Sequence, residues 1–184
     1  FKSTNGGGSW SAANTGLPGD TSVRSFGLDP ASPTTFYTGT QVGVFKTTDG
    51  GGHWSLANTG LTCGSARCLI GPLALDPQTP STLYAGVTPA GVFKSTNGGG
   101  SWSSANAGLP MTVFIALAID PQTPSTLYAG TQGFGVFKST DGGGHWSPAN
   151  TGLTCGNAAC TVAALVLDPV TPATLYAGTQ GFGV

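Results

Sequence analysis

Residues 137–146 read Phe-Lys-Ser-Thr-Asp-Gly-Gly-Gly-His-Trp, and close variants of this stretch begin at Phe1, Phe45 and Phe93. Each copy predicts a β-hairpin, because an Asp or Asn oxygen can accept hydrogen bonds from the N–H groups that follow it and the glycines allow positive φ. We expect the Trp to begin the return strand and to pack its ring beneath the turn. One hairpin alone is only marginally stable, so four copies at near-equal spacing predict a repeat protein.

The copies divide the chain into four units of two alternating lengths. Their first residues are 44, 48 and 44 positions apart, so residues 93–184 repeat the pattern of residues 1–92. The predicted repeats are 1–44, 45–92, 93–136 and 137–184. At 184 residues a folded chain buries roughly 70% of the surface that its unfolded form exposes, so a real core is expected.

Each unit contains four short segments with the composition of β-strands. The first is apolar and ends at an Asp-Pro turn, at Val23–Leu28, Leu73–Leu75, Phe114–Ile119 and Val162–Leu167. The second is built on a Tyr-containing run, the third on Val-Phe-Lys, and the fourth begins at the Trp. Four short strands in a repeat of about 40–50 residues are typical of a propeller blade, so the predicted fold class is an all-β β-propeller of four-stranded antiparallel blades.

The composition agrees with an all-β chain and limits the classes of partner. The chain has 31 Gly, 13 Pro and only 7% charged residues, and its acids are all Asp, a composition that disfavours helices. A net charge of -1 gives no indication of a nucleic-acid partner. No apolar run is long enough to span a bilayer, so we expect neither nucleic-acid binding nor a membrane span.

The pattern Ser-x-Asp-x-Gly-x-x-Trp, from Ser139 to Trp146, is the Asp-box, also called the BNR repeat. The copy from Thr47 to Trp54 changes only Ser to Thr, and the other two copies carry Asn at the Asp position, which keeps an acceptor oxygen. The chain therefore resembles Asp-box β-propellers: sialidases, the sortilin propeller, xyloglucanase-type glycoside hydrolases and photosystem assembly factors of the Ycf48 kind. The resemblance implies the fold but leaves the function open, because the same blade serves enzymes and binders.

The structural residues of the boxes are their Asx and Trp positions, namely Asn5, Trp10, Asp49, Trp54, Asn97, Trp102, Asp141 and Trp146. The Asp could ligate a cation or cap its own turn. One carboxylate in each unit is a poor start for the multi-oxygen cage that Ca²⁺ needs, so we favour capping and expect no metal and no other cofactor. His53 and His145 stand where the other copies have Ser, and we expect exposed turn residues rather than ligands or bases.

Two loops of the longer units each contain a Cys-x4-Cys pair, Cys63 with Cys68 and Cys155 with Cys160. Zinc sites usually have further Cys or His ligands nearby, and these loops have none. We therefore predict a local disulfide in each loop, with four reduced, buried thiols as the alternative. Disulfides persist in oxidising compartments, so an extracellular or cell-surface protein is expected.

Paired catalytic groups are not evident in the sequence. A glycoside hydrolase needs two carboxylates across one bond, but six of the seven Asp recur as parts of the Asp-Pro turns or the boxes. The resemblance to sialidases would require an arginine cluster and a Tyr nucleophile, whereas the chain has two arginines, Arg24 and Arg67, and its Tyr residues all lie in the repeated second strand. We predict that the segment is not an enzyme by itself.

The connections between strands alternate between the two ends of a blade, since successive strands are antiparallel. The boxes and Asp-Pro turns share one end, and the turns after the second strand and the loops after the fourth share the other, which carries the variation between units. Function is usually grafted on such loops. The candidate ligand-binding residues are Gln132, Phe134, Gln180, Phe182 and Arg67. The two Phe side chains would be stacking surfaces or, alternatively, covers of the blade edge.

These observations predict a non-catalytic extracellular module that acts as a structural scaffold or as a binding surface for protein or glycan. The alternative is a fragment of a larger Asp-box glycoside hydrolase whose catalytic acids lie outside this segment. An assay of the intact parent protein on a panel of glycans separates the two hypotheses, and so would paired acids in the flanking sequence.

The order of the strands also predicts that further repeats complete the propeller. The first unit supplies a third and a fourth strand without the two that precede them in a blade, and the last unit ends with a first and a second strand. Self-closure as four blades, head-to-tail closure of two chains as eight, and a longer array would each cover the open edges. We expect partner repeats, from a second copy or a continuing chain, most simply in an eight-bladed ring.

Overall fold

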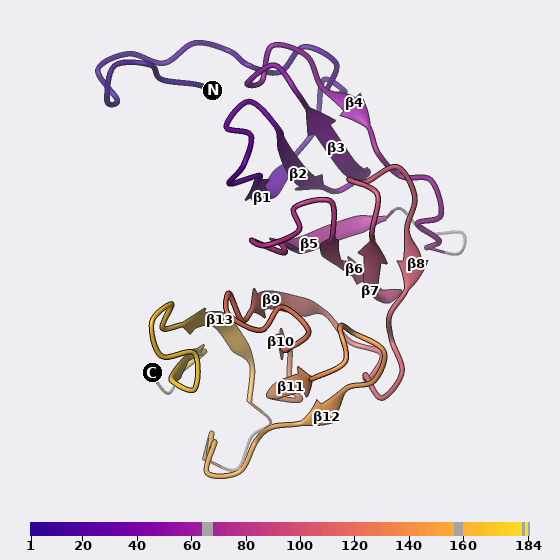
Figure 1. The fold of residues 1–184 in the computed structure, drawn as a ribbon, viewed down its shortest axis with the longest axis vertical. Helices are drawn as coiled ribbons and strands as arrows, with labels where there is room; N and C mark the ends of the chain where they lie inside the picture. The colour runs from indigo at the N-terminus through magenta and orange to yellow at the C-terminus, as the bar shows by residue number, and fades with distance from the viewer. Residues whose placement is uncertain (64–67, 157–159, 182, 184) are drawn as a thin grey trace.

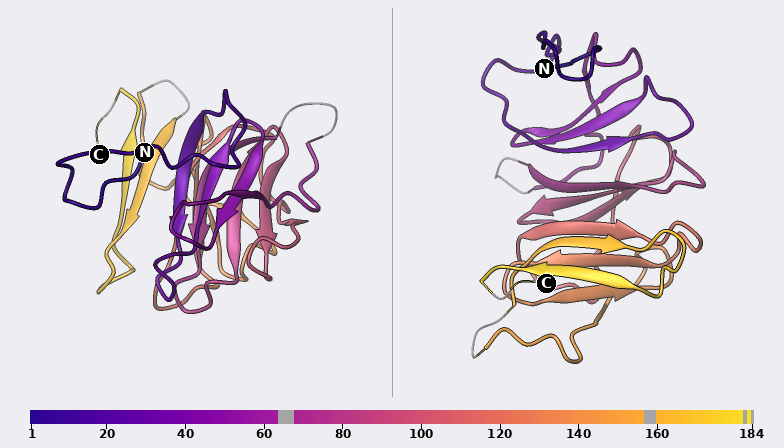
Figure 2. Two further views of the ribbon diagram at one scale, coloured as in Figure 1. Left: turned by 90° about the horizontal axis from the view of Figure 1, so that it is seen from above. Right: turned by 90° about the vertical axis from the view of Figure 1, so that its left-hand side faces the viewer.

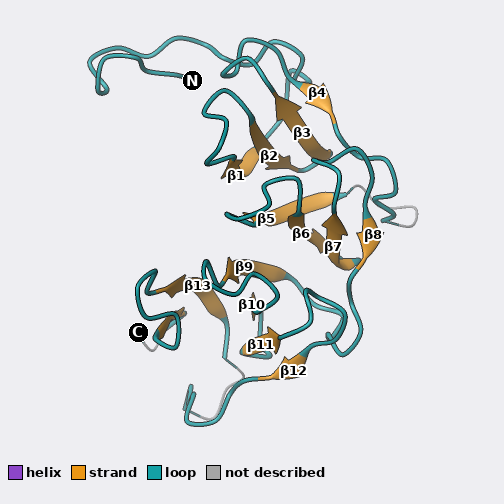
Figure 3. Ribbon diagram, in the orientation of Figure 1, coloured by secondary structure: helices purple, strands orange, loops and turns teal. Residues whose placement is uncertain are grey.

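The computed structural model describes all of the chain except residues 64–67, 157–159, 182 and 184. In this part the fold is all-β, with three four-stranded antiparallel sheets and one two-stranded sheet (Figure 1). Figure 3 shows the strands joined by turns and loops throughout. No helix among the described residues is long and apolar enough to cross a membrane.

Each sheet follows the chain in order, so every complete sheet is one predicted blade. Blade 1 consists of β1 (Val23–Leu28), β2 (Phe36–Thr40), β3 (Gly43–Thr47) and β4 (Ser55–Leu56). Blade 2 consists of β5 (Leu69–Leu75), β6 (Leu83–Thr88), β7 (Gly91–Ser95) and β8 (Ser103–Ser104). Blade 3 consists of β9 (Phe114–Ile119), β10 (Leu127–Thr131), β11 (Val136–Ser139) and β12 (Ser147–Pro148). The remaining pair, β13 (Val162–Leu167) and β14 (Leu175–Thr179), is called half-blade 4.

The blades stand side by side along an open arc. Their first strands pack in sequence, β1 on β5, β5 on β9 and β9 on β13, and the two chain ends lie at opposite ends of the arc (Figure 1). A bridge between Lys2 and Ser11 forms the N-terminal hairpin, which comprises residues 1–11 and precedes blade 1. Two views along other axes show the same succession of sheets (Figure 2).

The strands agree with the predicted ones except at two places. β5 begins at Leu69 rather than Leu73, and its pairing shifts between Ile70 and Leu73. Pro72 lies inside this shift, as expected for a residue that has no N–H to give to the ladder. The fourth strands are only two residues long and begin after the Trp instead of at it, because the backbone N–H of the Trp bonds to the loop that precedes its own blade.

The indole N–H groups of three Trp residues reach the segment that precedes their own blade. Trp54, Trp102 and Trp146 are all buried. The indole N–H of Trp146 donates to the carbonyl oxygen of Ala105 in the preceding blade at 2.9 Å. Trp102 makes the same bond to Ala57, and Trp54 makes it to Ala13, which follows the N-terminal hairpin. A buried indole needs such a partner, so each Trp ties its blade to the previous one.

The backbone of the same Trp adds a second bond across this interface. The N–H of Trp146 donates to the carbonyl oxygen of Ala107 at 2.8 Å. Gly108, the next residue, has a φ of 87°, and a Cβ there would collide with the carbonyl oxygen of Trp146. Gly16 and Gly60 stand in the same relation to the other two buried Trp residues, so this glycine is fixed by the approach of the next blade.

A Tyr and a Lys of each complete interface reach forward to the next box. The hydroxyl of Tyr84 and the ammonium of Lys94 both donate to the carbonyl oxygen of Gly142, at 3.0 and 2.9 Å. The Lys94 nitrogen also lies 5.4 Å from the centre of the Tyr84 ring, a cation–π distance. Burial raises the pKa of Tyr84 to about 12, with smaller contributions from the charges of Asp76 and Asp141, so the hydroxyl keeps the proton that it donates.

We predict that Trp146→Ala lowers the free energy of unfolding by about 3–5 kcal/mol, because it removes a large buried side chain together with its hydrogen bond. Urea unfolding followed by circular dichroism measures this change. The matched control is His145→Ser in the same box, which should change stability by less than about 0.5 kcal/mol because the imidazole is exposed. Equal losses in the two variants would contradict the interface role of the Trp.

Candidate binding face

The turns of the blades gather on two opposite faces. The boxes and the Asp-Pro turns form one face, called here the Asp-box face. The turns β2–β3, β6–β7 and β10–β11, together with the loops that lead from one blade to the next, form the other, called the loop face. Figure 2 shows the strands running between these faces.

On the Asp-box face each carboxylate of a box is used within its own turn. One oxygen of Asp49 accepts hydrogen bonds from the hydroxyl of Thr47 at 2.7 Å and from the backbone N–H of His53 at 3.0 Å. Asp141 makes the same two bonds in its box. The N–H of His53, and then the Thr47 hydroxyl, lower the pKa of Asp49 below the ordinary value of an Asp. These are the contacts of a turn cap.

The boxes with Asn use the extra donor of the amide. The side-chain oxygen of Asn97 accepts the backbone N–H of Ser101 at 2.8 Å, and its NH₂ group donates to the Ser101 hydroxyl at 2.9 Å. Asn5 makes the same pair of bonds to Ser9. Asn therefore occurs with Ser, while Asp occurs with an exposed His, and the two box types are alternative ways to close one turn.

On the loop face the β10–β11 turn is held by Asn150. The amide oxygen of Asn150 accepts the N–H of Val136 at 2.7 Å, and its NH₂ group donates to the carbonyl oxygen of Phe134 at 3.0 Å. Gly135 lies between these contacts with a φ of 76°, where a Cβ would collide with the Asn150 amide. The turn is therefore fixed to the loop that follows the fourth strand.

Both predicted disulfides are present, Cys63–Cys68 and Cys155–Cys160. The second one lies next to the β10–β11 turn, since the N–H of Gly135 donates to the carbonyl oxygen of Cys160 at 2.9 Å. A hollow of about 340 Å³ opens between turn and loop and is lined by Phe134, Leu153 and the two Cys residues, among others. The Phe134 side chain is 52% exposed at its edge, which gives the loop face an apolar contact surface.

Two of the other predicted binding residues are described by the structure, and neither lines this hollow. Gln132 is exposed in the same turn as Phe134, and its backbone N–H donates to the carbonyl oxygen of Val113. Gln180 is exposed beyond half-blade 4, where it belongs to the next turn of the repeat. Arg67 and Phe182 lie outside the described residues.

The sequence analysis missed the Asn that holds these turns. Asn58 and Asn106 bind the β2–β3 and β6–β7 turns as Asn150 binds the β10–β11 turn. A signal was present, because each of these Asn residues stands 14 positions after the Val that it binds, inside the repeated Asn-x-Gly-Leu motif. The constant separation indicates a repeated pairing, but it does not show that the Asn amide binds the backbone of the turn.

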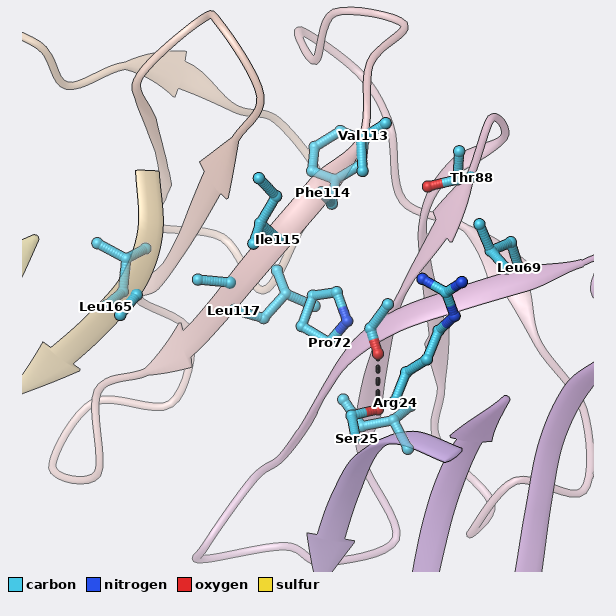
Figure 4. A pocket seen from close by; sticks show the side chains of 14 residues that line it. Arg24, Ser25, Leu69, Pro72, Thr88, Val113, Phe114, Ile115, Leu117 and Leu165 are labelled. Carbon is cyan, nitrogen blue, oxygen red and sulfur yellow. Dashed lines mark hydrogen bonds between the residues drawn. The ribbon is translucent and has the colours of Figure 1, made fainter. Parts of the chain in front are cut away.

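A second hollow, of about 490 Å³, lies among the first strands of the blades (Figure 4). Its lining is mainly apolar, and Arg24 is the one charged side chain among the described lining residues. The hydroxyl of Ser25 donates to the carbonyl oxygen of Gly71 at 2.6 Å and joins β1 to β5 at its wall. The described part of the lining therefore holds no pair of carboxylates for acid–base chemistry. Elsewhere in the described part of the chain, no three His, Cys, Asp or Glu side chains gather as metal ligands would.

Solved structures resemble this fold, although the chain matches no family model and no curated protein. The GH74 enzyme of Niastella koreensis is 26% identical over 85% of this chain and 26% of its own, with a TM-score of 0.68. An ancestral GH74 enzyme is 23% identical over 90% of this chain and 23% of its own, with a TM-score of 0.69. YCF48 bound to D1 peptide is 17% identical over 84% of this chain and 48% of its own, with a TM-score of 0.60.

These similarities confirm the predicted resemblance to Asp-box propellers and identify the four-stranded sheets as propeller-type blades. The chain spans about a quarter of the GH74 enzymes and about half of YCF48. The chain is thus similar to both in its propeller-type blades, and because one fold carries several functions, this similarity leaves the function of the chain open.

The Asp-type boxes should make stability depend on acid pH. The hydrogen bonds that lower the pKa of Asp141 favour its ionised form in the folded protein. Their contribution to stability is therefore full above the unfolded pKa, about 4, and is lost as pH falls through the lower folded pKa.

We predict that the double variant Asp141→Asn/His145→Ser, which copies the third box, loses less stability between pH 6 and pH 2.5 than the parent chain. Urea unfolding at the two pH values measures the difference. An identical acid dependence in parent and variant would contradict the capping role of the carboxylate.

Proposed function

We propose that the chain is a non-catalytic segment of an extracellular β-propeller whose loop face binds a protein or glycan ligand. The observation that carries this proposal is the half-exposed Phe134 on a turn that is fixed on both sides. An aromatic side chain on a turn whose backbone is already fixed can contact a ligand without the cost of ordering that backbone. Its flat face suits stacking on the apolar side of a sugar ring or on another side chain.

The disposition of the acidic residues supports a role without catalysis. Asp49 and Asp141 cap their boxes. The Asp-Pro residues cap the turns between the first and second strands, each through a backbone N–H two positions later at 2.8 Å, namely Asp29, Asp76, Asp120 and Asp168. Asp20 is left as a single carboxylate, whereas glycoside hydrolysis uses two across one bond.

The extracellular location rests on the two disulfides. Each closes a short loop between Cys residues that are five positions apart, and such bonds persist where thiols are not kept reduced. The Cys155–Cys160 disulfide also lies beside the turn that carries Phe134. The proposal therefore joins the two features in one site.

A second candidate function is supported by the 26% identity with the GH74 enzyme over 85% of the chain. On this hypothesis the segment is part of a larger glycoside hydrolase, and the catalytic acids come from blades outside it. The loop face would then contribute only to substrate contact.

We predict that the chain binds, without hydrolysis, to at least one member of a panel of immobilised glycans and secreted proteins. Phe134→Ala should weaken that binding by about 10-fold or more, as loss of a central aromatic contact does. Calorimetry on the ligand found in the panel gives the affinity, and reducing-sugar release gives the hydrolysis.

The matched control is Leu56→Ala, which removes an equally exposed apolar side chain from the outer strand β4. It should leave the affinity unchanged. Equal affinities for the parent chain and Phe134→Ala would argue against the loop-face site, and release of sugar by the segment alone would argue against the absence of catalysis.

A further inference from the structure

The two ends of the arc carry complementary halves of the interface that joins the blades. We propose that two copies of the chain associate head to tail, with half-blade 4 of one copy docked on the N-terminal hairpin and blade 1 of the other. In this complex Tyr176 of the first copy occupies a cavity beside Gly50 of the second. The inference concerns assembly and is independent of the ligand of the loop face.

The cavity lies between the N-terminal hairpin and blade 1. Its volume is about 540 Å³, and its lining includes Lys2, Trp10, Phe26, Gly50 and Trp54. Lys2 already donates to the carbonyl oxygen of Gly50 at 3.0 Å, as the Lys of each complete interface does. What those interfaces have in addition is a Tyr.

The missing Tyr is defined by the complete interfaces. The carbonyl oxygen of Gly98 accepts hydrogen bonds from the Lys46 ammonium and the Tyr37 hydroxyl, both at 3.0 Å. The carbonyl oxygen of Gly142 accepts the equivalent two bonds from blade 2. Gly50 holds the same position in its box. Among the described residues, the carbonyl oxygen of Gly50 accepts a side-chain hydrogen bond from Lys2 alone. The cavity therefore has an acceptor and the space for a Tyr hydroxyl.

Apolar side chains around the cavity are exposed where their counterparts are buried. Phe26 of β1 is 63% exposed, whereas Leu73 at the same register position of β5 is 9% exposed. Trp10 is 64% exposed, although the other three Trp residues are buried. A surface of this kind at the edge of a sheet favours association with another sheet.

The opposite end of the arc presents the Tyr. Tyr176 of β14 is 54% exposed, while its equivalents Tyr37 and Tyr84 are buried. Among the described residues β13 is the only strand that pairs with β14, and a single bridge from Thr179 to Gly183 lies on the other edge. In all three complete blades the Tyr of the second strand stands opposite the Lys of the third, so the repeat register places Tyr176 opposite Lys2 of the docked copy.

The same docking completes a second set of contacts on blade 3. The Lys138 nitrogen lies 5.4 Å from the centre of the Tyr128 ring, as in the complete interfaces, and Gly6 of the docked hairpin occupies the box position that receives such a pair. Ala149 follows Trp146 by three positions, as Ala13, the acceptor for Trp54, follows Trp10. It is therefore placed to accept the indole N–H of Trp10.

The two halves lie at opposite ends of one open arc (Figures 1 and 2), so they do not meet within this segment, and a second copy supplies the matching half. The two halves are different surfaces, so the contact between copies is heterologous. Two copies can form this contact twice, which gives a closed ring. Each closure joins the two strands of half-blade 4 to the two arms of the hairpin, which completes a four-stranded blade.

Light scattering coupled to size-exclusion chromatography on the 184-residue chain tests the proposal. The expected particle has twice the 18.2 kDa mass of one chain. Trp10→Asp and Tyr176→Asp should each weaken dimer formation by at least about 30-fold, as loss of a central contact does. Met111→Asp, an equally exposed apolar residue between blades 2 and 3, should have no effect. Circular dichroism verifies that all variants fold.

Mixing the two interface variants gives the decisive result. Trp10→Asp keeps an intact half-blade 4 and Tyr176→Asp keeps an intact N-terminal hairpin, so the mixture should recover a particle of two chains through one interface. A parent chain that remains a monomer at every concentration would overturn the proposal. So would a dimer that persists in either single variant, or a mixture that stays monomeric.

Discussion

The hydrogen bond from each buried Trp indole to the backbone of the preceding blade is the contact on which the arc depends. A buried N–H without an acceptor is costly, and here the acceptor is always the third residue after the preceding Trp. The backbone bond of the same Trp and the Tyr–Lys pair act across the same junction. The Asp-box therefore closes its own hairpin and also provides the groups that connect two blades.

The sequence predicts those parts of the fold that depend on local chemistry. The hairpins, the extents of β1, β9 and β13, and the two disulfides follow from turn residues, alternation and Cys spacing. The direction of Trp146 and the role of Asn150 do not, because their partners, Ala105 and the β10–β11 turn, come near only after neighbouring segments have folded. The early start of β5 at Leu69 was missed for a related reason, since Pro72 interrupts the pattern without ending the strand.

The candidate site divides in the same way. The position of Gln132 and Phe134 in a variable turn could be predicted from the alternation of connections, but the hollow beside them needs the loop of the Cys155–Cys160 disulfide to fold back against that turn. Most acids serve the Asp-box face as caps, which leaves the loop face nearly free of negative charge. Because the fixed turns lie on one face and the variable turns on the other, residues of the loop face can change without disturbing the junctions between blades.

The Tyr–Lys pair has a further consequence, because its target is a main-chain carbonyl. Side-chain recognition can be altered by substitution, whereas Gly98 and Gly142 present the same oxygen in every box. Each blade therefore binds the next one through a backbone carbonyl oxygen that every box provides. This contact does not depend on the side chains of the next blade. When a 92-residue double unit is duplicated, each new junction has the same Tyr, Lys and carbonyl groups as the existing junctions. The number of blades can therefore change without a new interface.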